Sequence, residues 1–251
     1  MPLHAEHDGG GPRLVLVHGF TQTGRCWGPV GDALAADHEV VRVDAPGHGR
    51  SAGVQADLPT GARLIGDQGG HATYLGYSMG ARFCLHLALA QPELVRGLVL
   101  LGGTAGIEDP AERAARRQQD LRTAVRIEDE GLAAFLDSWL DQPLFAGLPP
   151  ERAFQKERLT NTVEGLRSSL DQAGTGSQEP SWDRLAALTM PVLVLAGARD
   201  EKFAGLAARM AGAIGGNATL ALVAGAGHAA HLEQPAAFLA IVQPWLAAHG
   251  L

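Results

Sequence analysis

Short, nearly continuous apolar runs recur along the chain and alternate with segments of helical periodicity. The runs cover residues 13–17, 39–43, 72–75, 97–101, 191–197 and 218–223, and residues 3–7 are a further candidate. Such runs are typical of strands buried in a parallel sheet. Apolar residues with helical spacing follow at 27–36, 81–90, 203–214 and 235–248. The alternation predicts the α/β class, with a mostly parallel, doubly wound sheet covered by helices on both faces.

One long segment, residues 107–180, interrupts this alternation. It contains no strand-like run, and it combines helical periodicity with many charged residues. We therefore predict a helical cap at 107–180, inserted into a core formed by residues 1–106 and 181–251. The segment ends in a stretch rich in Gly, Ser and Pro, residues 174–180, which we expect to be a flexible hinge.

The sequence Gly76-Tyr77-Ser78-Met79-Gly80 lies between a predicted strand and a predicted helix. Strand, Gly-x-Ser-x-Gly and helix together are typical of a nucleophile elbow, a sharp turn that exposes its serine at the carboxyl end of a strand. Only small residues fit two positions before and after that serine. We therefore predict that Ser78 is a nucleophile or base.

Two further residues follow predicted strands in the order expected of partners for this serine. Asp200 comes after the run at 191–197, and His228 comes after the run at 218–223. A serine hydroxyl needs an imidazole to take its proton, and the imidazole needs a carboxylate to fix its tautomer. The order Ser, Asp, His is that of α/β-hydrolases. It predicts a catalytic triad of Ser78, His228 and Asp200.

An oxyanion hole needs two backbone N–H donors aimed at the developing negative charge. Met79, which follows the serine, and Phe20, which follows the strand at 13–17, are the predicted donors. We interpret His18 as a structural residue of the Phe20 loop and assign no chemistry to His48.

Composition and charge exclude several classes of protein. The chain has 251 residues, of which 46% are hydrophobic and 19% are charged, and its formal net charge is −7. This is the composition of a globular domain, and the absence of a dense basic block disfavours nucleic-acid binding. We find neither a membrane-length apolar run nor a secretory signal at the N-terminus. The expectation is a cytoplasmic protein without a membrane partner.

Motifs for cofactors are weak. Cys26 and Cys84 are the only cysteines, which excludes a cysteine-rich zinc site. His228 and His231 have metal-like spacing without an evident third ligand. We therefore expect no metal and no organic cofactor.

Arg82 departs from a generic esterase pattern because it lies one helical turn after Ser78, where small or apolar residues suit a packed position. A buried guanidinium requires a partner. Either Arg82 forms an internal salt bridge, for example to Asp44, or it binds a substrate carboxylate through its planar fork.

With these residues in hand, the chain resembles a branch of the α/β-hydrolase family, the 2-succinyl-6-hydroxy-2,4-cyclohexadiene-1-carboxylate synthases of the menaquinone pathway. The resemblance extends over nearly the whole chain. The segments that carry it are 18–21 with Trp27, 44–49, 76–82, 113–120, 139–145, 158–161, 197–203 and 227–233.

The resemblance implies a lyase that eliminates pyruvate from an enolpyruvyl tricarboxylate, with the triad acting as a base. It implies a small anionic substrate and a monomer or small homo-oligomer. The substrate-binding residues that it implies are Tyr77, Arg82, Arg116, Arg117, Trp139, Phe145, Arg158 and Lys202. It leaves open whether Arg113, Arg116 or Arg117 makes the first cap arginine contact. If Gln118 occupies that position instead, the contact itself is in question.

Two alternatives remain at this point. A hydrolase of esters or C–C bonds would use the same triad but would not need Arg82 and a cationic cap. A receptor without catalytic activity could use the same fold to bind a small molecule, although an intact triad argues against it.

Overall fold

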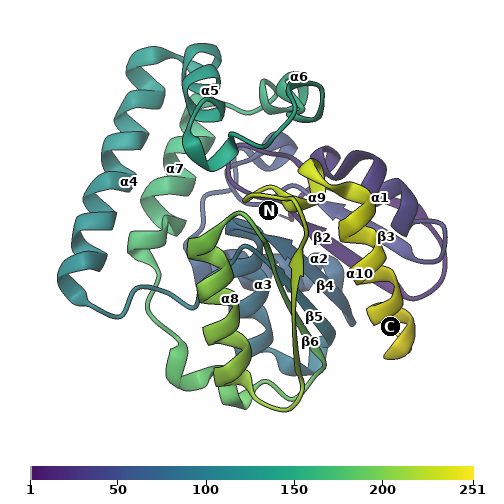
Figure 1. The fold of residues 1–251 in the computed structure, drawn as a ribbon. Coiled ribbons are helices and arrows are strands. Elements are labelled where there is room, and N and C mark those ends of the chain that lie inside the picture. Colours follow the sequence, from purple (N-terminus) through teal and green to yellow (C-terminus); the bar gives the residue numbers. More distant parts are fainter. Residues whose placement is uncertain (1) are drawn as a thin grey trace.

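The computed structural model describes residues 2–251 (Figure 1), and within them seven strands form one sheet in the order β1-β3-β2-β4-β5-β6-β7. The strands are β1 (Ala5–Gly9), β2 (Arg13–Val17), β3 (Glu39–Val43), β4 (Ala72–Tyr77), β5 (Val95–Leu101), β6 (Val192–Gly197) and β7 (Ala218–Val223). The first strand pairs antiparallel with β3, and the other pairings are parallel. The predicted fold class is confirmed.

Helices cover both faces of the sheet. One face packs against α2 (Leu58–Gly69), α3 (Met79–Ala90) and α8 (Glu201–Ile214). The other packs against α1 (Gly28–Leu34) and α10 (Pro235–Ala248), and the short α9 (Ala230–Glu233) precedes α10. Because the central strands are buried on both faces, they appear in the sequence as continuous apolar runs.

Helix α2 was not predicted from the sequence. Glycines within it weaken the helical signal, since glycine in a helix interior costs about 1 kcal/mol relative to alanine. These glycines allow close packing: a Cβ at Gly61 would lie 2.5 Å from the Phe83 ring, and one at Gly66 would lie 2.7 Å from Leu87. Asp57 caps the helix by accepting a hydrogen bond from the Thr60 N–H. Tertiary packing therefore outweighs local propensity here.

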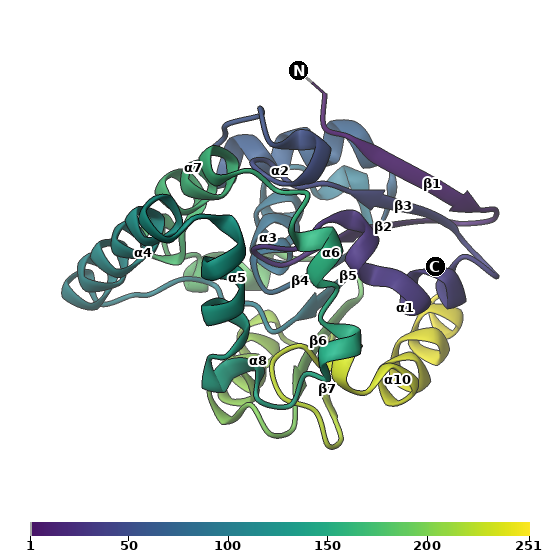
Figure 2. The ribbon, with the colours of Figure 1, turned by 90° about the horizontal axis from the view of Figure 1, so that it is seen from above.

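Between β5 and β6 the chain forms the helical layer seen from above in Figure 2, with α4 (Pro110–Glu130), α5 (Leu132–Leu140), α6 (Gln155–Arg158) and α7 (Val163–Ala173). These helices have a small core of their own, formed by Ala124, Ile127, Phe135, Leu136, Leu166 and Leu170. We call residues 107–180 the cap; the boundaries of this division stay a prediction.

The end of the cap is packed, contrary to the expectation of a flexible hinge. Thr175–Ser177 form a 3₁₀ turn, and the Gly176 N–H donates to Asp120. A Cβ at Gly176 would lie 2.2 Å from the Arg117 nitrogen. The glycine is therefore needed for close approach to α4 and not for flexibility.

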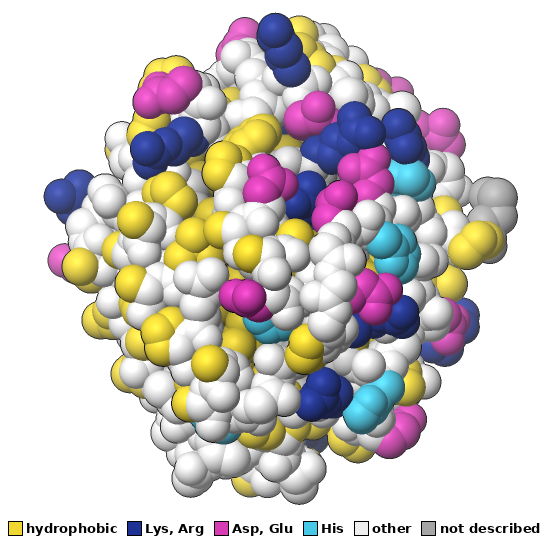
Figure 3. Space-filling model, turned by 90° about the vertical axis from the view of Figure 1, so that its right-hand side faces the viewer, with side chains coloured by type: hydrophobic (Ala, Val, Ile, Leu, Met, Phe, Trp, Pro, Cys, Tyr) yellow, Lys and Arg dark blue, Asp and Glu magenta, His cyan; other side chains and the backbone are white. Residues whose placement is uncertain are grey.

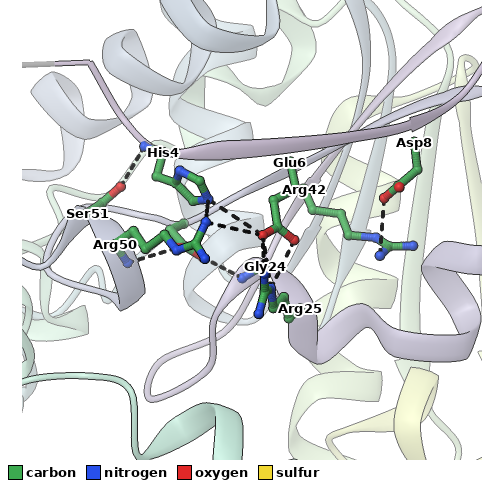
Figure 4. Close-up of polar contacts among 9 residues, drawn as sticks. His4, Glu6, Asp8, Gly24, Arg25, Arg42, Arg50 and Ser51 are labelled. Carbon is green, nitrogen blue, oxygen red and sulfur yellow. Dashed lines mark hydrogen bonds and ion pairs between the residues drawn. The ribbon is translucent and has the colours of Figure 1, made fainter.

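Basic and acidic side chains are mixed on the face shown in Figure 3. Three arginines near β1, which we call the outer arginine cluster, are Arg25, Arg42 and Arg50 (Figure 4). Glu6 pairs with Arg25 at 2.6 Å and with Arg50 at 3.6 Å, and Asp32 pairs with Arg42 at 2.6 Å. Each of these charges is thus compensated within the protein. Within residues 2–251, no helix is both long and apolar enough to cross a membrane.

Candidate active site

Ser78 occupies a strained turn between β4 and α3. Its φ is +53°, a backbone conformation that residues other than glycine rarely adopt. The flanking glycines are required by space: a Cβ at Gly76 would lie 2.4 Å from the Gly80 oxygen, and one at Gly80 would lie 2.0 Å from the Val17 oxygen. The turn therefore projects the serine into the space beneath the cap.

Ser78, His228 and Asp200 form one hydrogen-bonded chain. His228 Nδ1 lies 2.8 Å from Asp200 Oδ2, and His228 Nε2 lies 3.0 Å from Ser78 Oγ. With the carboxylate as acceptor, Nδ1 carries the proton in the neutral imidazole, and Nε2 is free to accept the serine proton. The other carboxylate oxygen of Asp200 accepts from the Phe203 N–H at 3.2 Å and so caps α8.

The two residues predicted to form the oxyanion hole border the same space. Phe20 and Met79 both line the cavity beside Ser78. In the part of the chain that the structure describes, neither N–H has a hydrogen-bond partner. Free donors beside the serine are what an oxyanion hole requires.

A cavity of about 780 Å³ lies between the strand ends and the cap. The residues predicted for the site that line it are Phe20, Tyr77, Ser78, Met79, Arg82, Arg116, Trp139, Phe145, Arg158, Lys202 and His228. Asp200 lies behind His228. Arg117 is not among the lining residues: it binds the Asp171 carboxylate and the Ser177 hydroxyl. The structure thus does not support the prediction that Arg117 contacts substrate.

Among the cap arginines left open by the sequence, Arg116 is the one that lines the cavity. Its Nε lies 2.8 Å from Asp120 Oδ1, so part of its charge is compensated. Arg113 instead donates to the Ile107 carbonyl at 3.0 Å.

Arg82 and Arg158, which we call the inner arginine pair, are buried beside the cavity. Arg82 is 7% exposed and donates to the Ala173 carbonyl at 2.8 Å. Arg158 is 1% exposed and donates to the Ala153 carbonyl at 2.7 Å and to the Thr21 hydroxyl. Among residues 2–251, no carboxylate forms an ion pair with either.

The salt bridge between Arg82 and Asp44, considered from the sequence, does not form. Asp44 accepts from the Gly24 and Arg50 N–H groups instead. Burial lowers the pKa of Arg82 to about 10, and burial also lowers the pKa of Arg158. At neutral pH the Arg82 guanidinium therefore stays charged, and an uncompensated buried charge favours binding of an anion.

The sequence matches the alpha/beta hydrolase family over residues 14–241. A 2-succinyl-6-hydroxy-2,4-cyclohexadiene-1-carboxylate synthase of Salmonella schwarzengrund is 35% identical, with 94% of this chain and 95% of the relative covered. The chain belongs to this branch of the α/β-hydrolase family. It is therefore an enzyme of that superfamily, and the resemblance stated from the sequence is confirmed.

Solved structures of other α/β-hydrolase proteins agree with this assignment. MenH from S. aureus superposes with a TM-score of 0.92 at 28% identity and covers 99% of each chain. A thermophilic esterase from Thermogutta terrifontis has a TM-score of 0.85 at 24% identity, covering 99% of this chain and 94% of its own. The second likeness supports the fold alone.

Three buried histidines of this α/β-hydrolase play structural parts. His18 accepts from the Ala45 N–H at 3.0 Å, and His48 accepts from the Thr21 N–H at 3.3 Å. His231 packs its ring against Trp27 and Tyr77, and neither of its ring nitrogens has a partner in the described chain. Burial lowers the pKa of His18 to about 4 and the pKa values of His48 and His231 to about 3. All three are therefore neutral near pH 7.

No role was predicted for Glu233 from the sequence, although the structure places it beside the His228 loop. Its carboxylate accepts from the Gly227 N–H at 2.7 Å and from the Ala229 N–H at 3.0 Å. These two amides flank His228. An acidic residue five positions after the histidine is visible in the sequence, but neither its burial nor its hydrogen-bond partners follow from that spacing.

Proposed function

We propose that the protein is a carbon–oxygen lyase of menaquinone biosynthesis. It would eliminate pyruvate from 2-succinyl-5-enolpyruvyl-6-hydroxy-3-cyclohexene-1-carboxylate and form 2-succinyl-6-hydroxy-2,4-cyclohexadiene-1-carboxylate. The names of the relatives support this activity. The observation that carries it is the inner arginine pair, two buried guanidinium groups at the cavity that holds Ser78, which have no carboxylate partner among the described residues.

In the proposed mechanism, the triad acts as a base. His228 takes the Ser78 proton, and the serine oxygen removes a proton from a substrate carbon. The electrons of that C–H bond form the C2=C3 double bond, the ring double bond moves from C3=C4 to C4=C5, and the bond from C5 to the enolpyruvyl oxygen breaks. The proton returns from His228 to the departing enolpyruvate, which leaves as pyruvate.

Negative charge that develops on the substrate during proton removal would be held by the oxyanion hole. Phe20 and Met79 line the cavity beside Ser78, and within residues 2–251 their N–H groups have no hydrogen-bond partner. Fixed donors stabilise an enolate without reorganisation, and one such donor is worth on the order of 10²–10³ in kcat.

The three carboxylates of the substrate give the cationic wall a common purpose. Arg82 and Arg158 would bind carboxylates through their planar forks, and Lys202 and Arg116 line the same cavity. The cavity volume also falls within the roughly 300–1,000 Å³ range of small-molecule sites. Tyr77, Trp139 and Phe145 supply aromatic surface for the carbon ring.

The second candidate is a hydrolase of carboxylic esters or C–C bonds. It would use the same Ser78, His228 and Asp200 chain. A neutral ester has no carboxylate to compensate the inner arginine pair, so we prefer the lyase. The cytoplasmic location, the absence of nucleic-acid partners and the state of monomer or small homo-oligomer stay predictions from the sequence.

The test is to supply the purified enzyme with the enolpyruvyl substrate and, separately, with a nitrophenyl ester. The lyase proposal expects rapid pyruvate release and slow ester hydrolysis. Fast ester hydrolysis without pyruvate release would favour the hydrolase.

A further inference from the structure

Thr21, the residue after Phe20, has an unusual backbone conformation. Its φ is +68°, although it is β-branched and fully buried. A β-branched residue in the left-handed region is strained and persists only where its surroundings hold it. Contacts from the surrounding residues must therefore hold the Thr21 backbone in this conformation.

Three partners bind Thr21. Its N–H donates to His48 Nε2 at 3.3 Å, and its carbonyl accepts from Asn161 Nδ2 at 2.8 Å. Its hydroxyl accepts from Arg158 Nη1. His48 belongs to the core, whereas Arg158 and Asn161 belong to the cap, and all are buried.

Asn161 connects three separate segments. Besides Thr21, its Nδ2 donates to the Arg158 carbonyl at 2.9 Å, and its Oδ1 accepts from the Gly49 N–H at 2.8 Å. The amide side chain is thereby fixed at both ends, with its donor directed at Thr21. A fixed donor can hold a strained backbone.

The other amides around Phe20 are also tied. The Gly19 N–H donates to Gln22 Oε1 at 3.1 Å, and the Gln22 N–H donates to the Gly19 carbonyl at 3.1 Å. In the described chain, Phe20 alone among residues 19–22 has an N–H without a partner. The hydrogen bonds of Gly19, Thr21 and Gln22 therefore hold the loop from which the free Phe20 N–H extends.

We propose that Asn161 is a positioning residue of the oxyanion hole. From the cap, it holds Thr21 in the left-handed region and so aims the Phe20 N–H at the cavity. This inference rests on the proposed function only in taking Phe20 as an oxyanion donor. It makes an intact cap necessary for the geometry of the catalytic step as well as for substrate binding.

The direct test is Asn161→Asp. This variant keeps the size and the acceptor for the Gly49 N–H but replaces the donor to Thr21 by an oxygen. We expect kcat to fall by roughly 10–100-fold, because a misplacement of about 1 Å can cost 10²-fold, while KM changes little. The loss should be the same for the enolpyruvyl substrate and for the nitrophenyl ester, since both need the oxyanion hole.

Rescue distinguishes positioning from a general structural role. Glycine adopts positive φ without strain, so in a Thr21→Gly background the backbone at position 21 no longer depends on Asn161. Because this variant also loses the hydroxyl that accepts from Arg158, its own kcat is measured first and is the reference. Added to Asn161→Asp, Thr21→Gly should restore most of the lost kcat. If Asn161→Asp lowers kcat equally with threonine and with glycine at position 21, the proposal is overturned.

A matched control removes another link between cap and core. Arg152→Ala deletes hydrogen bonds to the Leu232 and Glu233 carbonyls and should leave kcat near the wild-type value.

If Asn161→Asp proves too unstable to assay, Asn161→Ala with Thr21→Gly is tested against Thr21→Gly alone, and equal kcat values are expected. A wild type that releases no pyruvate would refute the lyase, whereas normal ester turnover by Asn161→Asp would refute the positioning role.

Discussion

The outer arginine cluster and the inner arginine pair differ in how their charges are compensated. The outer cluster, Arg25, Arg42 and Arg50, is paired with acidic residues that surround it (Figure 4). The inner pair is more deeply buried, and its partners in the described part of the chain are carbonyl and hydroxyl groups alone.

Stability alone would favour pairing the buried arginines with carboxylates before the exposed ones, and the protein does the opposite. Surface ion pairs contribute about 0–1 kcal/mol, whereas a buried charge without a counter-ion is costly. The outer arginines can be explained without a ligand. The inner pair is best explained by a ligand that brings negative charge to the cavity, and the predictions below test that contrast.

The largest effect should come from removing the base while leaving both groups of arginines intact. We expect Ser78→Ala or His228→Ala to reduce pyruvate release on the order of 10³-fold or more, with the fold preserved. Steady-state turnover and circular dichroism check this. A folded Ser78→Ala enzyme with near-normal turnover would contradict the mechanism.

Removing an inner arginine should cost far more than removing an outer one. Arg82→Ala should lower kcat/KM for the enolpyruvyl substrate by a factor that corresponds to roughly 2–5 kcal/mol of lost transition-state stabilisation, as when one partner of a buried charge pair is removed. Arg25→Ala is the control and should leave kcat/KM within about twofold, as expected for an exposed ion pair. Arg82→Lys should not restore full activity, because an ammonium cannot reproduce a planar fork. Similar losses in Arg25→Ala and Arg82→Ala would remove the contrast.

Buried histidines should make the free energy of unfolding depend on pH in acid, whereas the inner arginines stay charged there. The pKa of His231 is lowered to about 3 by burial, below its unfolded value. As pH falls below about 6.5, the unfolded chain binds a proton that the folded protein does not, and stability decreases by about 1.4 kcal/mol per pH unit for this group.

Chemical denaturation between pH 7 and pH 4 measures this slope. His231→Phe suits the aromatic surroundings. Because the His231 ring nitrogens have no partner among residues 2–251, the variant loses no hydrogen bond described there. The variant should show a smaller slope by about that amount. Identical slopes in the variant and the wild type would mean that His231 does not titrate as its burial implies.

The smallest effect should separate the two neighbouring cap arginines. Arg116 lines the cavity and is partly compensated by Asp120, so Arg116→Ala should weaken kcat/KM modestly. Arg117 binds Asp171 outside the cavity, so Arg117→Ala should leave kcat/KM nearly unchanged. Parallel kinetics on the two variants check this order, and a larger loss in Arg117→Ala would reverse the assignment.

The sequence predicts the sheet and the turn that carries Ser78 well because both depend on local patterns, and the catalytic role of the triad stays a prediction. The strand at Ala218–Val223 matches its apolar run residue for residue, and Ser78 is marked by the glycines that its turn requires. The glycine-containing α2 was missed because its packing against Phe83 and Leu87 is not visible locally.

Roles that depend on contacts between distant segments could not be predicted. Asn161 and Thr21 are 140 positions apart in the sequence, and no spacing rule connects them. Arg116 and Arg117 are adjacent, so only the orientation of α4 decides which one lines the cavity. Charge can be counted from a sequence, but its compensation requires the structure.

The most direct test of the central claim compares two substrates in one variant. The ratio of kcat/KM for the enolpyruvyl substrate to kcat/KM for a neutral nitrophenyl ester is measured in the wild type and in Arg82→Ala. If the inner arginine pair binds substrate carboxylates, this ratio should fall in the variant by a factor that corresponds to roughly 2–5 kcal/mol of transition-state binding. The ester is affected less because it has no carboxylate to lose. An unchanged ratio, with both substrates losing equally, would mean that Arg82 is structural and would favour the hydrolase.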